Sequence, residues 1–225
     1  MRRFAGAPAP RAHGVLFALT TLLMAGAALG AGAPFAALTV TPAGAQSYNL
    51  TTGVTTLADG GTVVDGDTGV KLNAATITYV DGVYIDAKGA SVVGSFGTLK
   101  ADEVHIDIKA GVMTASGKLS LKRDALSVTA AAVRYDANNE VVDFKGPVAG
   151  TAPDFRADRV LLDALSGNVL LIGNYRFSEG PLVLEAPKGG GRLELIFHRV
   201  HGAPVYDAST EVAPPLLARL SAELH

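Results

Sequence analysis

The stretch Leu99–Leu121, LKADEVHIDIKAGVMTASGKLSL, decides the fold, because it reads as two β-strands joined by a turn. Apolar residues alternate along both strands, and residues two apart lie on the same face of a strand. Gly117 stands in the middle of the second strand, on the same face as Leu119 and Leu121. A glycine inside a strand often marks a bend or a bulge. We therefore predict a bent strand with an apolar inner side.

The first strand of this stretch changes its alternation partway along. The apolar alternation that begins at Leu99 shifts by one position at Val104. An extra residue near Asp102 and Glu103 would return both parts to one face, which is what a β-bulge does. The sequence thus predicts a bulge, repeated at the same place in each similar stretch.

Similar stretches recur along the chain. Each has an alanine two positions after its start, and the starts are Leu72, Leu99, Val128 and Phe155. Each then has a turn and a glycine in its second strand: Gly89, Gly117, Gly146 and Gly173. A fifth copy begins near Leu184. Because one such unit cannot bury its own apolar face, we expect an all-β fold of antiparallel hairpins of about 28 residues, stacked side by side.

The two ends of the chain differ from the repeat region, residues 46–213. Residues 1–45 have the layout of an export signal, with arginines at the start followed by a long apolar stretch. Cleavage after Ala45 fits this layout, and so does cleavage after Ala31 or Ala33. An uncleaved anchor is the alternative, since residues 14–40 are apolar enough to span a bilayer.

The last twelve residues, 214–225, read PPLLARLSAELH. Proline at a helix start and leucines at helical spacing predict a short amphipathic helix. We expect this helix to cover one open end of the stacked hairpins.

The composition excludes several classes of function. The chain has no cysteine, so thiol catalysis and cysteine-ligated metal are excluded, and the fold must hold without disulfides. A net charge of −2 gives no electrostatic footprint for nucleic acid. The five histidines follow no zinc spacing, and no GxSxG nucleophile elbow is present. We predict a protein that is not an enzyme and has no cofactor or metal.

A bent sheet with an apolar inner side would form a trough for a lipid chain. Each buried methylene contributes about 0.8 kcal/mol, so about twelve carbons would gain on the order of 10 kcal/mol before ordering costs. The same apolar face would equally serve as the core of a closed β-sandwich, and the residues alone leave both interpretations open. The predicted wall residues share the inward parity: Leu99, Val104, Ile106, Ile108, Met113, Leu119, Leu121, Val142, Phe144, Val148, Val160, Leu162, Val169, Leu171, Tyr175 and Phe177.

Two stretches, LKADEVHIDIKAGVMTASG from Leu99 and FRADRVLLDALSGNVLLIGN from Phe155, resemble the OstA/LptA repeat. In that repeat an Ala-Asp step opens a hairpin and a glycine, often Gly-Asn, closes it. The resemblance covers roughly residues 72–177 and implies an antiparallel β-jellyroll, or β-taco. In the family, such domains carry lipopolysaccharide between the inner and outer membranes, with acyl chains inside. The Ala-Asp step is complete only at Ala101 and Ala157, which leaves the cargo open.

The resemblance implies a periplasmic carrier of lipopolysaccharide or a similar envelope glycolipid. Exposed edge strands at the ends of the stack would contact other jellyroll proteins of the same system, or further copies of this chain. One alternative is a structural envelope protein that carries nothing and assembles edge to edge. Another is a scaffold like the family member LptC, anchored in the inner membrane and bound to a transporter.

Overall fold

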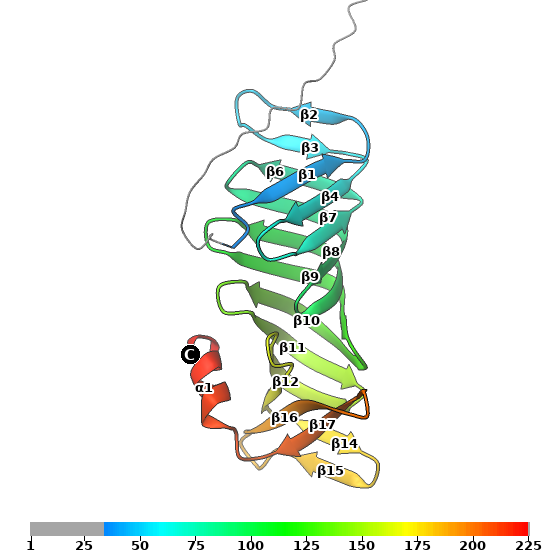
Figure 1. Ribbon diagram of the computed structural model, residues 1–225, viewed down its shortest axis with the longest axis vertical. Helices are drawn as coiled ribbons and strands as arrows, with labels where there is room; N and C mark the ends of the chain where they lie inside the picture. The colour runs from blue at the N-terminus through cyan, green and yellow to red at the C-terminus, as the bar shows by residue number, and fades with distance from the viewer. Residues whose placement is uncertain (1–33, 225) are drawn as a thin grey trace, which may run out of the picture. The chain divides into compact units, whose positions relative to one another are not determined.

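The computed structural model describes residues 34–224, which form antiparallel β-structure followed by one short helix (Figure 1). The strands are β1 Leu38–Pro42, β2 Gln46–Tyr48, β3 Thr55–Leu57, β4 Gly61–Asp65, β5 Lys71–Ala74, β6 Thr76–Val80, β7 Tyr84–Gly94, β8 Gly97–Asp107, β9 Val112–Arg123, β10 Leu126–Asp136, β11 Val141–Thr151, β12 Asp154–Asp163, β13 Val169–Gly173, β14 Arg176–Glu179, β15 Leu182–Glu185, β16 Gly191–Val200 and β17 Ala203–Ser209. The helix α1 spans Pro214–Leu220, and a 3₁₀ turn follows at Ser221–Glu223. The predicted all-β class and the short C-terminal helix are confirmed.

Six long strands, β7 to β12, pair consecutively and run through two layers. One half of each long strand belongs to a layer that we call layer A. At one end of the stack this layer continues through β6, β3 and β2, and at the other end through β13, β16 and β17. The other half of each long strand belongs to layer B, which continues through β5, β4 and β1 at one end of the stack and through β14 and β15 at the other. Strand β12 illustrates the division, because it pairs with β13 through Arg159–Leu162 and with β14 through Asp154–Arg156. Each long strand therefore contributes one half to each layer.

The two layers meet at a bend where the predicted bulge is confirmed. The register between β8 and β9 shifts between Lys100 and Glu103, and similar shifts interrupt the pairs β9–β10, β10–β11 and β11–β12. A Cβ added at Gly117 would lie 2.8 Å from the Cβ of Asp102, and only glycine combines this approach with a positive φ at low cost. The predicted glycines lie along this bend with positive φ: Gly89 (59°), Gly117 (72°), Gly146 (85°) and Gly173 (88°).

The folded part begins earlier than the sequence predicts. The expected export segment, residues 1–45, includes Leu38–Pro42, but these residues form β1 and pair with β4 in layer B. Phe35 is fully buried in the hydrophobic cluster between the layers. The apolar residues before Pro34, on which the signal prediction and most of the predicted anchor (residues 14–40) rest, lie outside the described residues, whereas the last part of that anchor range falls in β1. Within residues 34–224 no helix is both long and hydrophobic enough to cross a bilayer.

Helix α1 lies against the outer face of layer A and not over an open end of the stack, where we expected it from the sequence (Figure 1). Leu216 and Leu220 pack against Leu161 and Leu170, which face outward from β12 and β13. An amphipathic helix must bury its apolar face, and these outward leucines provide the surface. The helix is therefore packed against the side of the stack.

Ionic contacts fix the helix on this face. The Nη2 of Arg219 donates a 2.8 Å hydrogen bond to Oδ1 of the buried Asp163. Burial alone would raise the pKa of Asp163, but the hydrogen bonds from Arg219 and Ser166 outweigh it and lower this pKa. Beyond the helix, Glu223 accepts a 2.6 Å hydrogen bond from Nη1 of Arg134.

Candidate functional site

The predicted wall residues gather in one hydrophobic cluster between the two layers. Fifteen of the sixteen are buried members of this cluster, and the half-buried Ile108 packs against it. Strand pairing sets them in rows that cross the strands, so the lining continues along the stack. One such row in layer A runs through Ala87, Val104, Ala115, Val133, Phe144, Val160 and Leu171.

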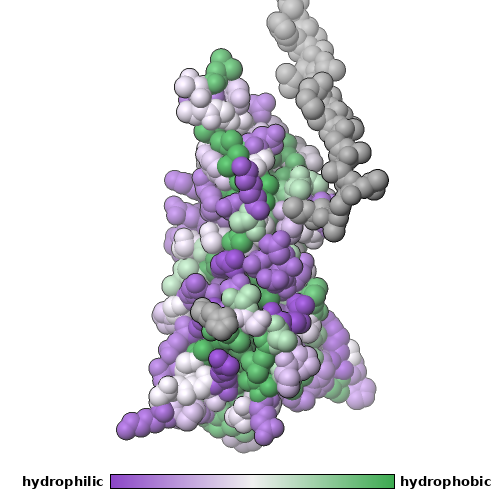
Figure 2. Space-filling view, turned by 90° about the vertical axis from the view of Figure 1, so that its left-hand side faces the viewer, coloured by the Kyte–Doolittle hydropathy of each residue, from purple (hydrophilic) through white to green (hydrophobic). Residues whose placement is uncertain are grey.

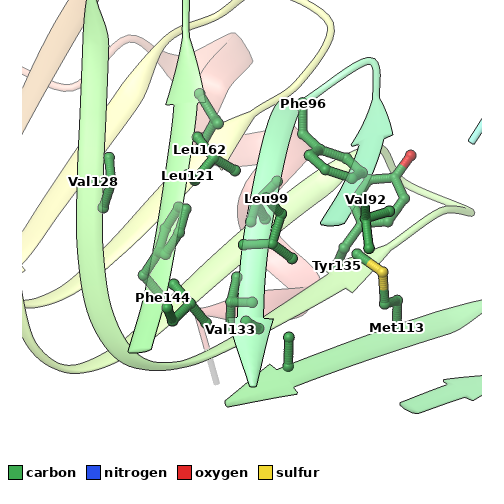
Figure 3. Packing of buried hydrophobic residues seen from close by; sticks show 14 of the residues in the cluster. Val92, Phe96, Leu99, Met113, Leu121, Val128, Val133, Tyr135, Phe144 and Leu162 are labelled. Atoms are coloured by element: carbon green, nitrogen blue, oxygen red, sulfur yellow. The ribbon is translucent and has the colours of Figure 1, made fainter. Parts of the chain in front are cut away.

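The interior is filled by its own side chains. Met113 from layer A and Leu121 from layer B are fully buried, and so are the rings of Phe144, Phe155 and Phe177. Figure 3 shows side chains from both layers pointing toward one another in this space. The structure thus places the sixteen residues in a packed core, and a lipid chain would have to displace part of that packing to enter.

One side of the interior has no backbone closure. The layers are continuous through the bend, but on the opposite side, which we call the seam, no described strand of one layer pairs with a strand of the other. Side chains bridge the seam instead. Phe96, from the β7–β8 turn of layer B, contacts Tyr135 of layer A with ring centroids 4.6 Å apart. Beside them, Ser95 donates a hydrogen bond to Glu140.

A second contact crosses the seam farther along the stack. The guanidinium of Arg199 on β16 donates a hydrogen bond to Asp124 in the β9–β10 turn, and it also lies 5.6 Å from the ring centroid of Phe197. Exposed ion pairs of this kind contribute about 1 kcal/mol or less. The buried contact between Phe96 and Tyr135 therefore contributes more to closure of the seam than this ion pair does.

The hydroxyl of Tyr135 is an exception to the apolar lining. It is buried beside the seam, within reach of Ser95 and Glu140, but it completes no hydrogen bond of good geometry with either, while Ser95 bonds to Glu140. Burial raises the pKa of Tyr135, so the phenol stays neutral. An unpaired buried hydroxyl costs free energy, and it could be satisfied by a polar group on a ligand.

A hollow lies elsewhere, on the outer face of layer A. Its volume is about 610 Å³, and of the sixteen predicted residues only Val104 lines it. The floor is lined by short side chains such as Thr76, Thr114 and Ser116. The remaining lining is mostly charged or hydroxyl-bearing and faces outward: Thr78, Asp86, Lys88, Glu103, His105, Arg134 and Lys145, with Ala87, Ala115, Ala132 and Val133 between them. The run of short residues at outward positions was the available sequence signal for this hollow.

Charged side chains surround the outer hollow, but much of its lining surface is carbon. His105 Nδ1 lies 2.7 Å from Oδ1 of Asp86, and both side chains are about half exposed. In the view of Figure 2, onto the side that bears α1, hydrophobic residues concentrate in the lower half and hydrophilic residues prevail directly above them. Because this hollow lies outside the interior cluster to which the predicted wall residues belong, we do not place the lipid there.

The ends of the stack present unpaired strand edges. Within residues 34–224, β2 pairs only with β3, and β15 pairs only with β14. Tyr48 on β2 is 59% exposed, and Leu182 and Val183 on β15 are 46% and 47% exposed. An exposed apolar edge strand is a template for pairing with another chain.

The described residues, 34–224, contain no group of three metal-ligating side chains that could hold an ion. No protein-family model matches the chain, and no curated protein matches its sequence.

Proposed function

We propose that this protein is an exported, non-enzymatic lipid carrier of the OstA/LptA type, which holds the acyl part of an envelope lipid between layers A and B. The observation that carries the proposal is an apolar interior that runs across the long strands and is closed on one side by side chains only. No bond is made or broken in this function; binding is burial of apolar surface.

The energetics allow such binding even though the interior is filled. An acyl chain of about twelve carbons would gain on the order of 10 kcal/mol gross from burial. Separating the layers at the seam breaks side-chain contacts but no backbone ladder, because the pairing runs along each layer. Displaced rings such as Phe96 would then contact the lipid, so much of their burial is kept. The repeat of Ala-Asp and glycine resembling the OstA/LptA family supports the same function.

A structural role is the second candidate, and a specific observation favours it. The interior residues are almost fully buried without any ligand, as the core of a self-sufficient domain would be. In this role the free edges, β2 and β17 of layer A and β1 and β15 of layer B, would join copies of the chain or related jellyroll proteins end to end. The same edges would serve the carrier, where end-to-end contact would extend the apolar interior from one protein to the next.

Native mass spectrometry of the protein, purified without detergent from its own envelope, separates the two functions. A carrier retains an adduct of lipid mass. Met113→Glu, which places a charge in the interior, should lose the adduct, whereas Thr114→Glu, one residue away on the exposed outer face, should keep it. Because a buried charge also destabilises the fold, Met113→Trp serves as a second variant that fills space without adding charge.

A protein that carries no lipid adduct in repeated preparations, while it forms end-to-end oligomers, would favour the structural role. An adduct that survives both Met113 variants in folded protein would place the lipid outside the interior. Either result would overturn the proposed function.

A further inference from the structure

We infer that the lipid chain enters sideways through the seam, at the contact between Phe96 and Tyr135, and that the ring of Phe96 occupies the place that the chain takes. The inference rests on the proposed function and adds to it a route and an entry residue. The alternative route is threading from an open end of the stack.

Phe96 belongs to a turn and not to a strand, as does the buried Phe35. It belongs to the Gly94–Gly97 turn between β7 and β8, whereas Phe144, Phe155 and Phe177 belong to strands held by ladders. Its side chain is nevertheless 1% exposed, so a turn residue has its ring inserted into the interior. A ring attached to a turn can leave the interior without breaking strand pairing.

The backbone of the turn is shaped to this ring. A Cβ added at Gly94 would lie 2.7 Å from Cε1 of Phe96, so the absence of a side chain at Gly94 makes room for the ring. Gly97, at the other end of the turn, has φ of 113°, a value that L-residues rarely adopt. The two glycines therefore permit the turn to carry Phe96 inward.

The residues around Phe96 could contact both the acyl chain and the polar head of a lipid. Val92, Leu99 and Met113 are buried in the same cluster and would contact an acyl chain (Figure 3). The unpaired Tyr135 hydroxyl stands at the rim, where the chain would join its polar head. A carbonyl or hydroxyl oxygen of a fatty acid or glycolipid would accept the hydrogen bond that Tyr135 does not complete with Ser95 or Glu140. The lipid head would then remain outside the seam.

The chain has no cysteine, so a cross-link can test this route without interference. Ser95→Cys with Glu140→Cys, joined by a short bis-methanethiosulfonate linker, ties the two layers across the seam. The matched control is Thr62→Cys with Asn73→Cys, since these two side chains lie 2.8 Å apart on neighbouring strands of layer B and do not bridge the seam. Uptake is followed by the fluorescence of a bodipy-labelled dodecanoic acid.

The locked seam should lose probe uptake, the control should keep it, and reductant should restore it by removing the linker. Phe96→Ala should raise the rate of probe uptake by about tenfold, because uptake scales with the fraction of protein molecules whose seam is open. Equal uptake by the locked seam and the locked control would overturn the lateral route and leave the carrier function standing, with entry from an end. If neither the unmodified protein nor any variant takes up the probe, the carrier function itself is refuted.

Discussion

Replacing Gly117 by alanine tests whether the bend in β9 requires glycine. Gly117 has φ of 72°, and an added Cβ would lie 2.8 Å from Cβ of Asp102 and 2.9 Å from its Oδ2. The left-handed conformation costs an L-residue about 1–2 kcal/mol, and overlap with the Cβ of Asp102, which the backbone holds in place, costs about 1–3 kcal/mol more. Alanine also restricts the unfolded chain more than glycine does, which offsets about 0.5 kcal/mol of this loss of stability. We therefore expect Gly117→Ala to lower the free energy of unfolding by about 3 kcal/mol.

Gly82 is the matched control for this substitution. It has φ of 64° in the turn before β7, and no neighbouring atom lies within 4 Å of an added Cβ. Gly82→Ala carries the conformational cost without the overlap, so we expect a loss of about 1 kcal/mol. Urea unfolding followed by circular dichroism measures both losses. Equal losses in the two variants would refute the reasoning, because the close approach to Asp102 would then contribute nothing to the bend.

Three further predictions concern the start of the domain, the helix and the seam. Phe35→Ala should cost about 3–5 kcal/mol of unfolding free energy, and a chain that begins at Gln46 should be less stable still; parental stability of either would contradict the placement of β1 in the fold. The pKa of Asp163 is lower in the folded protein than its ordinary value of 3.8, so its stabilising contribution is present above pH 3.8 and is lost as the pH falls through the folded-state pKa. Arg219→Gln should weaken this acid dependence in a pH series of urea melts, and an unchanged dependence would count against the ion pair. Tyr135→Phe should raise the unfolding free energy by about 1 kcal/mol, since it removes a buried hydroxyl without a partner; a loss of stability would reveal a partner for that hydroxyl.

The bend and the inward face were predictable because both follow from local sequence. The period of two fixes which side chains share a face, and the glycine and the shift near Asp102 recur in each unit. This is why the sixteen predicted wall residues fall in a single interior cluster.

The closure of the interior was not predictable in the same way. The contact between Phe96 and Tyr135 joins two hairpins across the seam, and no periodicity in either hairpin indicates it. The position of α1 depends on Leu161 and Leu170. That these two side chains point away from the interior is evident only once β12 and β13 are placed in layer A. Strand β1 was missed because its alternating residues continue directly from the apolar stretch that we predicted to be an export signal.

The most direct test of the central claim uses Met113, the one methionine among residues 34–224, whose side chain is buried between the layers. The measurement is the ¹³C-methyl methionine spectrum of the protein during titration with dodecanoic acid that carries a nitroxide at the end of its chain; Met113→Leu assigns the signal. A lipid chain held between the layers predicts strong broadening of the Met113 methyl signal, reversed when ascorbate reduces the nitroxide. A Met113 signal that stays sharp at saturating lipid would contradict the account.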